Sequence, residues 1–366
     1  MLAEPRGRQR KCVWAHGGIG RRAPDRASAE TRLVHMTNLE AVATERVCTP
    51  GGAPAAADVT AGFELLEPRD VPLGGIRAMS VRRTLPQRAR SFVGAWCFLD
   101  HYGPDDVAAT GGMRVPPHPH TGLQTVSWLF SGEIEHRDSL GTHCLVRPGE
   151  MNLMTAGRGI SHSEDSTGAT TLLHGVQLWT VLPEADRGAA PAFEHHVPPV
   201  VPLDGGEARV FLGTLAGSTS PVRTFSPLVG AEVRLRPGAT HTFHVDPAFE
   251  HAVLVDSGAL TVDGVEAPVS HLLYREPGAT TLTLAATGDV DARVLLIGGL
   301  PLGEQIVMWW NFIGRDHDEV VAARARWQAE IADPDAPTPG FGRVQGHPAA
   351  PLPAPPMPEL RLRPRA

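Results

Sequence analysis

Short apolar runs alternate with glycine-rich and proline-rich turns along most of the chain. The first half has such runs at residues 64–68, 78–85, 92–103, 126–130, 133–136 and 172–182, and the second half has them at residues 210–215, 231–245, 251–264, 270–284 and 292–299. Short strands between turn residues are typical of β-sandwiches and β-barrels. The pattern therefore predicts an all-β fold.

The second half repeats the plan of the first half weakly, because residues 251–264 align loosely with residues 125–138. Between the halves, residues 183–202 are rich in proline and interrupt the strand pattern, as a connection between two barrels would. We expect two β-barrel domains, the first over residues 63–185 and the second over residues 203–332.

One stretch near the C-terminus has helical spacing. Asp316 and Glu319 form the pattern of a capping box, and Val320, Trp327 and Ile331 recur at intervals that place them on one helix face. This pattern predicts a single C-terminal helix with a packing role. Large aromatic residues after an apolar strand usually belong to the core, so we expect Trp309 and Trp310 to be buried there.

Both ends of the chain lack a core-forming pattern. Residues 1–62 are expected to be a disordered extension, with an arginine-rich segment over residues 1–35 and a more ordinary translation start at Met36. Residues 333–366 form a proline-rich tail, in which residues 360–363 are expected to cover a sheet edge.

Composition narrows the class of protein. The 366 residues, 42% of them hydrophobic, suffice for two ordinary cores. The net charge of −7 does not favour direct binding to nucleic acid, which is itself negatively charged. No apolar run of about 18 residues predicts a membrane span. The four cysteines lie far apart and suggest no disulfide framework, so we expect a cytoplasmic protein.

Two pairs of polar residues are spaced for metal binding. His118 and His120 are two residues apart, as are His162 and Glu164, and alternation along a strand sends both members of each pair to one face. Three imidazoles and one carboxylate leave two open positions on an octahedral first-row metal. We expect Fe(II), with Mn, Ni, Cu or Zn as alternatives.

The residues around these pairs strengthen the prediction. Gly112, Gly132 and the turn at Pro148-Gly149 resemble the cupin pattern G-x5-H-x-H-x3-E-x6-G, which a P-G turn and a third histidine follow. Gln124 stands where that pattern has Glu, and Gly132 lies one residue late. Glutamine offers no negative charge, so Glu164 is expected to supply it. If no bulge intervenes, six residues should share the face that lines the site: His118, His120, Gln124, Val126, Trp128 and Phe130.

Four longer runs resemble the pirin family of the cupin superfamily. They are residues 117–141, 147–164, 174–183 and 298–320. The resemblance implies two stacked cupin barrels with one C-terminal helix. It also implies a metal held by the first barrel through His118, His120, His162 and Glu164, and no metal in the second barrel.

The second barrel lacks the paired histidines. Its remaining histidines are expected to be structural or exposed, because an isolated imidazole needs convergent partners before it binds a metal; they are His241, His244, His251 and His271. We therefore expect one metal ion per chain.

Other polar residues lie in the family-like runs. Five of them are expected to form hydrogen bonds at strand ends or to support the metal ligands: His101, His136, Arg137, Asp138 and His174. Arg158 could orient Glu164 or attract an anionic substrate.

Two hypotheses about function remain open at this level. The resemblance includes quercetin 2,3-dioxygenases, which cleave the heterocycle of a flavonol with O2 and release carbon monoxide, with Glu164 as the catalytic proton acceptor. It also includes iron-dependent regulators that bind a transcription factor or a metabolic enzyme. The partners are accordingly a flavonol-like aromatic molecule and O2, or another protein.

Overall fold

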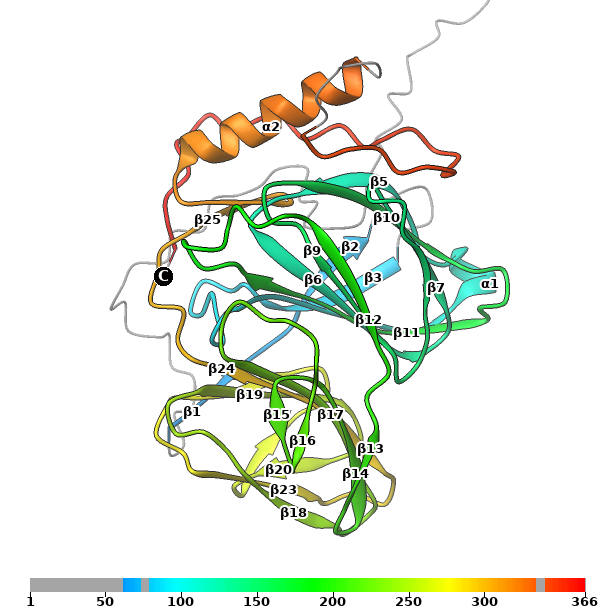
Figure 1. The fold of residues 1–366 in the computed structure, drawn as a ribbon. Helices are drawn as coiled ribbons and strands as arrows, with labels where there is room; N and C mark the ends of the chain where they lie inside the picture. Colours follow the sequence, from blue (N-terminus) through cyan, green and yellow to red (C-terminus); the bar gives the residue numbers. More distant parts are fainter. Residues whose placement is uncertain (1–61, 74–78, 334–339, 366) are drawn as a thin grey trace, which may run out of the picture. The chain divides into compact units, whose positions relative to one another are not determined.

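The computed structural model describes residues 62–73, 79–333 and 340–365, and strands account for most of them (Figure 1). The predictions for residues 1–61, including the start at Met36, lie outside the described residues. All the strands in the sheets pair antiparallel, as short strands joined by tight turns normally do. The all-β class is confirmed.

The first barrel is built from a larger and a smaller sheet. In spatial order, the seven-stranded sheet contains β12 (Ala192–His196), β9 (Met151–Thr155), β6 (Leu123–Ser131), β11 (Leu172–Val181), β4 (Trp96–Asp106), β3 (Met79–Leu85) and β2 (Arg69–Leu73). The four-stranded sheet contains β5 (Arg114–His120), β10 (Ile160–Ser166), β7 (Ile134–Asp138) and β8 (His143–Val146).

The second barrel repeats this plan. Its seven-stranded sheet contains β1 (Phe63–Leu66), β22 (Leu272–Arg275), β19 (Glu250–Ser257), β24 (Ala292–Gly299), β17 (Leu228–Leu235), β14 (Gly206–Leu212) and β13 (Val200–Leu203). Its four-stranded sheet contains β18 (Thr240–His244), β23 (Thr281–Ala286), β20 (Leu260–Val262) and β21 (Val265–Ala267). The second barrel also carries a small hairpin of β15 (Thr214–Leu215) and β16 (Ser218–Thr219).

The two large sheets pack against each other through one apolar core that both barrels share. Trp128 of the first barrel stacks on Phe211 of the second, with ring centroids 4.8 Å apart, and its indole N–H donates to Glu232 at 2.7 Å. The backbones also come close, since a Cβ on Gly94 would lie 2.7 Å from the Cα of Gly299. The outer face of each large sheet is thus as buried as its inner face.

This packing corrects the expected shared face. Val126, Trp128 and Phe130 belong to the core between the barrels, whereas Ser127 points to the inside of the first barrel. The chain turns between β5 and β6 at Gly122, whose φ is +72°, and alternation does not carry across that turn. The histidines of β5 and the apolar residues of β6 therefore lie on different faces.

Strand exchange corrects the expected barrel boundaries. β1 pairs with β22 and so belongs to the second barrel, although it precedes the first barrel in sequence. β12 pairs with β9 and extends the first barrel to His196, inside the stretch expected to be a connection. Edge strands can pair with whichever sheet offers unpaired backbone groups, which hydrophobic spacing does not specify.

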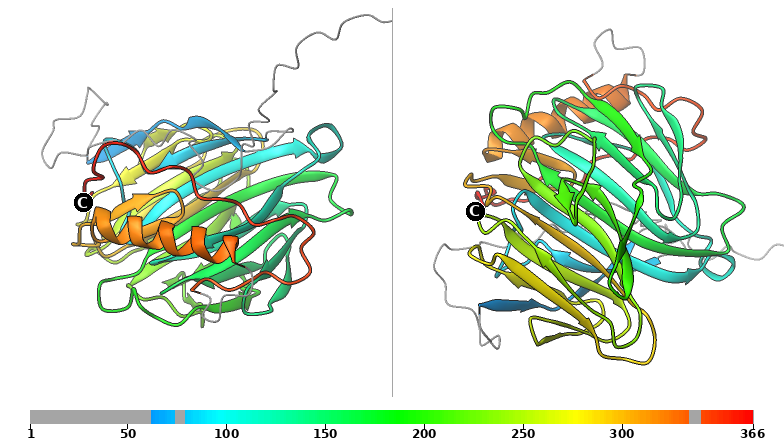
Figure 2. Two further views of the ribbon diagram at one scale, coloured as in Figure 1. Left: turned by 90° about the horizontal axis from the view of Figure 1, so that it is seen from above. Right: turned by 60° about the horizontal axis from the view of Figure 1, so that its bottom comes forward.

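The segment after residue 300 also lies on the first barrel (Figures 1 and 2). A hairpin of β25 (Val307–Trp309) and β26 (Phe312–Gly314) precedes α2 (His317–Ala332), and Phe312 bridges to Thr121, next to His120. Trp309 and Trp310 are both buried in the core under the helix, as expected.

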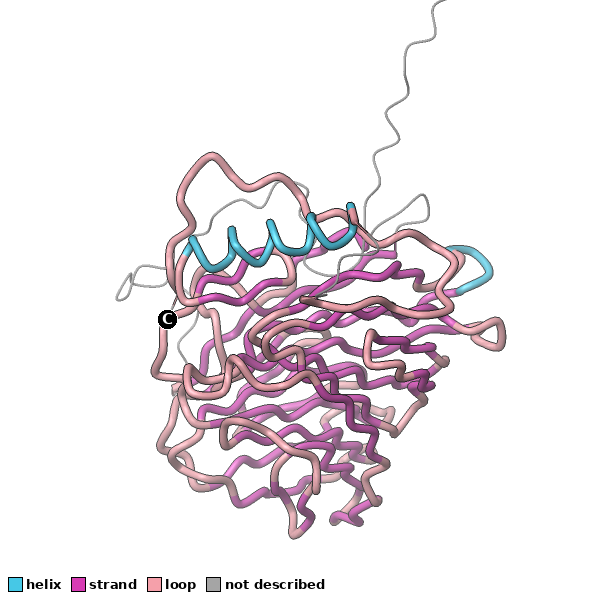
Figure 3. The backbone as a smooth tube through the Cα atoms, turned by 45° about the horizontal axis from the view of Figure 1, so that its top comes forward, coloured by secondary structure: helices cyan, strands magenta, loops and turns pink. Residues whose placement is uncertain are grey.

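The helix itself confirms its prediction. Asp316 is the N-cap and accepts a hydrogen bond from the backbone N–H of Glu319 at 2.9 Å, while Val320 and Trp327 are buried. The other described helix, α1 (Val107–Thr110), is a single turn that the sequence pattern did not predict (Figure 3). Neither of these two described helices is long and apolar enough to cross a bilayer.

The C-terminal tail is fastened to the helix by one carboxylate. Glu330, which is buried, accepts hydrogen bonds from the backbone N–H groups of Gly340, Phe341 and Gly342 at 2.7–2.9 Å. The carbonyl oxygen of Phe341 in turn accepts from the backbone N–H of Ser161 at 3.0 Å. The tail is therefore tied to β10, the strand that carries His162 and Glu164.

We predict that Glu330→Ala lowers the free energy of unfolding by about 2–4 kcal/mol, because three backbone donors lose a charged acceptor. Denaturant unfolding followed by circular dichroism measures the change. Glu276→Ala, at an exposed turn, is the matched control and should change stability by less than about 0.5 kcal/mol. Equal effects of the two substitutions would contradict the role of Glu330.

Candidate metal centre

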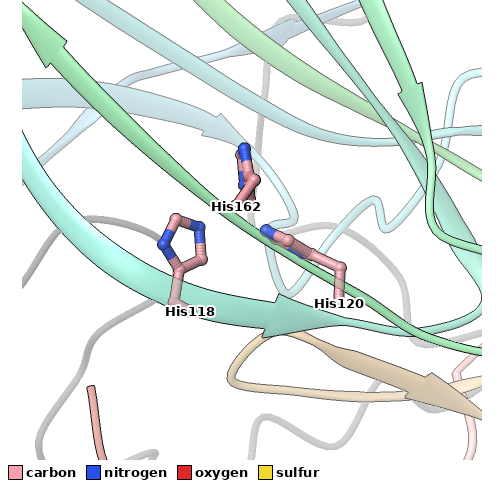
Figure 4. Close-up of side chains that lie close together, drawn as sticks. All are labelled: His118, His120 and His162. Atoms are coloured by element: carbon pink, nitrogen blue, oxygen red, sulfur yellow. The ribbon is translucent and has the colours of Figure 1, made fainter. Parts of the chain in front are cut away.

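Two neighbouring strands bring three histidines together. β5 carries His118 and His120, and β10 carries His162, which pairs directly with His118 in the antiparallel register. Directly paired residues point to the same face of a sheet, about 5 Å apart. Figure 4 shows the three rings facing a common centre, and their centroids lie 4.3–5.0 Å apart.

The hydrogen bonds of these rings favour metal binding. All three side chains are buried, and His118 Nδ1 lies 2.9 Å from the carbonyl oxygen of Pro116, which makes Nδ1 the protonated nitrogen and leaves the lone pair on Nε2. Within the described residues, both ring nitrogens of His120 and Nε2 of His162 lack a hydrogen bond of normal geometry. Buried nitrogens of this kind are costly unless a ligand satisfies them.

Burial also keeps the imidazoles in the form that a metal requires. It lowers the pKa of His120 and of His162 well below the ordinary value, and the neighbouring His118 acts in the same direction. The carbonyl oxygen of Asn311 opposes this effect only in part at His120. Neutral imidazoles bind a cation without first releasing a proton.

A second histidine supports His162 from behind. His136 Nδ1 lies 3.4 Å from His162 Nδ1, and His136 Nε2 lies 3.4 Å from a carboxylate oxygen of Asp138. This sequence of contacts assigns the Nδ1 proton to His162 and the Nε2 proton to His136, and so directs the lone pair of His162 Nε2 toward the centre. His136 thus contacts His162, as expected of a supporting residue, while the role of His162 as a metal ligand remains a prediction.

Glu164 lies in a group that overlaps this one. Its carboxylate forms a compact set with His136 and His162, and the three imidazoles form another set around the shared His162. Ser127 Oγ lies 3.0 Å from Glu164 Oε1 and also 3.0 Å from Gln177 Oε1, but a hydroxyl has one proton to donate. Burial raises the pKa of Glu164, although His136 and Ser127 act against it. A buried carboxylate with so few donors fits a nearby cation.

Other predicted residues lie elsewhere. Gln124 donates to Thr155 and to the carbonyl oxygen of Arg223, away from the three histidines. Arg158 is exposed and makes no ion pair with Glu164 among the described residues. Arg137 pairs with Glu135 at 2.8 Å. Gln124 is therefore not placed as a ligand, and no contact among the described residues supports the expected role of Arg158 in orienting Glu164.

A polar row on the large sheet faces the centre and was missed from the sequence. Six residues that pair across six neighbouring strands form this row: Arg83, Asp100, Gln177, Ser127, Asn152 and His195. Paired residues share a face, so the whole row points into the barrel. The sequence of β6 does contain a signal for this row, because Thr125 and Ser127 alternate with the apolar Val126 and Trp128. Both faces of the strand are buried, however, so the alternation does not show which face is the inner one.

A second cluster lies between the barrels. His101 on β4 and His174 on β11 both approach one oxygen of Asp256 on β19, at 2.8 and 2.6 Å, and Arg293 binds the other oxygen at 2.7 Å. His101 and His174 had been expected to bond at strand ends, and Asp256 was not foreseen. The second barrel supplies the carboxylate, which explains why spacing within the first barrel gave no hint of it.

This cluster is satisfied without a cation. The Nε2 protons of both histidines reach Asp256, while Arg82 lies 3.4 Å from His101 Nδ1 and Arg293 lies 3.4 Å from His174 Nδ1. Burial lowers the pKa of His101, although Asp256 opposes it. Two guanidinium groups would also repel a metal ion. The cluster is therefore an electrostatic contact between the barrels.

The four histidines of the second barrel do not converge. His244 is exposed, His251 is buried, and His241 and His271 are half-buried. Among the described residues, no group of three metal-binding side chains contains any of these four. One metal ion per chain remains a prediction.

Comparison with known proteins places the chain within one family. Residues 77–180 match the model of the family described as Pirin, and residues 230–331 match that of the Pirin C-terminal cupin domain. Together these matches cover more than half of the chain.

Relatives extend this similarity over most of the chain. A Pseudomonas aeruginosa protein named as a candidate quercetin 2,3-dioxygenase is 43% identical over 293 residues, which are 79% of this chain and 89% of that protein. A pirin-like protein of Caulobacter vibrioides is 37% identical and covers 68% of this chain and 88% of its own length. The crystal structure of quercetin 2,3-dioxygenase from Acinetobacter baumannii superposes with a TM-score of 0.76 at 36% identity, and covers 82% of this chain and 97% of that one.

We predict that His162→Gln lowers metal occupancy at least about tenfold, because His162 belongs to both metal-binding groups, whereas His174→Gln leaves occupancy unchanged. Elemental analysis of each purified protein measures the metal content per chain, and circular dichroism confirms that both variants fold. Loss of metal from His174→Gln, or two metals per chain in the parent, would show that the cluster between the barrels binds a cation.

We also predict that His101 makes stability depend on pH. The unfolded chain protonates this residue near pH 6.5, about its ordinary pKa, while the folded chain keeps it neutral at lower pH. Its contribution is therefore present above pH 6.5 and is lost as the pH falls below that value. His101→Gln keeps a donor to Asp256 but cannot titrate, so unfolding free energies measured from about pH 7 to pH 5 should fall less steeply than in the parent. Equal slopes would contradict this assignment.

Proposed function

The chain belongs to the pirin family of two-barrel cupin proteins, and from this premise we propose that it is a mononuclear oxygenase of the quercetin 2,3-dioxygenase type with Fe(II) as its metal. The observation that supports a metal here is the convergence of three buried imidazoles, and within the described residues Nε2 of His162 and both ring nitrogens of His120 have no hydrogen bond of normal geometry. The relatives named for quercetin 2,3-dioxygenase support the reaction class. Mn, Ni, Cu or Zn could also bind nitrogen and oxygen ligands.

His118, His120 and His162 would hold the metal, with Glu164 as the fourth ligand. A bound first-row cation supplies Lewis acidity that lowers the pKa of a flavonol 3-hydroxyl group. The chain's own contribution is to place the carboxylate of Glu164 where it can accept that proton, with Ser127 Oγ 3.0 Å away to orient it. The overall reaction cleaves the flavonol heterocycle with O2 and releases carbon monoxide.

Aromatic side chains surround the imidazoles. The ring of Trp179 meets His120 edge-on at 5.2 Å and stacks on Phe98 at 4.0 Å, while Phe193 lies 4.7 Å from His136. Such buried rings exclude water from the surroundings of the imidazoles, where the reacting atoms would lie. A cytoplasmic location fits Cys97 and Cys144, which are both free thiols.

We predict that the metal-loaded protein consumes O2 and releases carbon monoxide with quercetin, and that Glu164→Gln lowers the turnover rate about 100-fold or more by removing the proton acceptor. An oxygen electrode and gas-phase carbon monoxide detection measure the two gases after reconstitution with each candidate metal. Glu232→Gln, which changes a buried glutamate between the barrels, is the matched control and should retain activity within a few-fold.

A folded, metal-loaded parent that consumes no O2 with any flavonol would overturn the enzymatic proposal. That outcome would favour the iron-dependent regulator, whose partner is a transcription factor or a metabolic enzyme.

A further inference from the structure

Two buried polar groups on the inner face of the first barrel have no hydrogen-bond partner among the described residues. They are the hydroxyl group of Tyr102 and the amide nitrogen Nδ2 of Asn152. Tyr102 is 1% exposed and Asn152 is 2% exposed, so bulk water does not satisfy them. Unpaired buried groups of this kind are rare in native proteins and point to a partner that the protein alone does not supply.

The orientation of Asn152 leaves its donor free. Its Oδ1 lies 2.7 Å from His195 Nδ1, and when that nitrogen carries the proton Oδ1 accepts it and the NH2 group is left to donate elsewhere. Asn152 pairs with Ser127 in the polar row, and Ser127 touches Glu164. The free N–H bonds therefore lie one strand away from the residue that contacts the candidate proton acceptor.

Tyr102 lies on the same inner face, farther along the barrel. It lies two positions along β4 from Asp100 of the polar row, a step of about 7 Å, and its ring packs in the apolar cluster at that end of the barrel. Gly175 on β11 leaves room for it, since a Cβ there would lie 2.9 Å from the Tyr102 oxygen. Burial, with a further contribution from the charge of Glu164, raises the pKa of Tyr102, so the hydroxyl remains a donor.

We propose that Tyr102 and Asn152 bind the ring hydroxyl groups of a polyhydroxylated flat aromatic substrate whose enol group faces the three imidazoles. This assignment rests on the proposed function and names the part of the substrate that these residues recognise. Asn152 lies one strand from Ser127, and Tyr102 lies two positions along β4 from Asp100 of the polar row, so both belong to the inner face that contacts Glu164. A phenolic hydroxyl can both accept from an amide N–H and exchange a hydrogen bond with a tyrosine. Hydrogen bonds to otherwise unpaired groups discriminate strongly between ligands with and without a hydroxyl.

Two flavonols separate this recognition from metal binding. Quercetin and 3-hydroxyflavone share the 3-hydroxy-4-keto group, but only quercetin carries additional ring hydroxyls. The protein is loaded with Zn(II), which has no redox chemistry, and is titrated with each flavonol under nitrogen while the flavonol absorbance is recorded. Binding is thus measured apart from turnover.

The parent is expected to bind both flavonols, quercetin more tightly. Tyr102→Phe removes one hydroxyl, and Asn152→Asp removes the N–H donors while it keeps an oxygen for His195. Each should weaken quercetin binding about tenfold and leave 3-hydroxyflavone binding within about twofold. Tyr274→Phe is the matched control, because Tyr274 is the other tyrosine of the chain and donates to Glu250 in the second barrel. It should change neither affinity.

Three results would overturn the assignment. If the parent binds both flavonols with equal affinity, or if the two variants weaken both flavonols equally, ordered water and not the substrate satisfies these groups, while the proposed function stands. If the parent binds neither flavonol at full zinc occupancy, the proposed function fails together with this assignment. Elemental analysis and thermal unfolding of each variant confirm that metal content and fold are retained.

Discussion

The large sheet of the first barrel is buried on both faces, and this constraint decides which of its side chains face the candidate metal centre, whose histidines lie on the small sheet. Its outer face packs on the second barrel through residues such as Trp128, and its inner face carries the polar row that includes Ser127. Because neighbours along a strand point to opposite faces, a shift of one residue would exchange the two sets. Polar groups would then enter the shared core, and Ser127 would no longer contact Glu164. The apolar contact between the barrels therefore fixes the register on which the chemistry depends.

The two histidine clusters show how similar residues acquire different roles. Around His162, several buried ring nitrogens have no hydrogen bond of normal geometry within the described residues, and the carboxylate of Glu164 is buried beside them, so a cation would stabilise the group. Around His174, each nitrogen already has a partner, and Asp256 is paired with a guanidinium group. Burial of charge and of unpaired polar groups is expensive, so partner count separates a metal site from a structural contact. Ligand type alone would not separate them.

The C-terminal segment belongs structurally to the barrel that precedes it by more than one hundred residues. The second family match ends at residue 331, within α2, yet Trp309 and Trp327 form a core over the first barrel, and the tail reaches β10 through Phe341. β1 makes the opposite exchange and completes the second barrel. Each barrel thus depends on chain from the other half.

The sequence alone determined the all-β class, the repeated barrel, the capped helix and the histidines of the centre, because these follow from local alternation, turn residues and spacing within single strands. His118 and His162 could be recognised as candidate metal ligands because each lies in a short, well-marked motif. The tertiary structure alone decided which face of β6 is inner, which barrel owns β1, and that Asp256 joins His101 across the interface. Those outcomes depend on contacts between residues far apart in the chain. When both faces of a strand are buried, alternation shows that two faces exist but does not show which one faces the inside of the barrel.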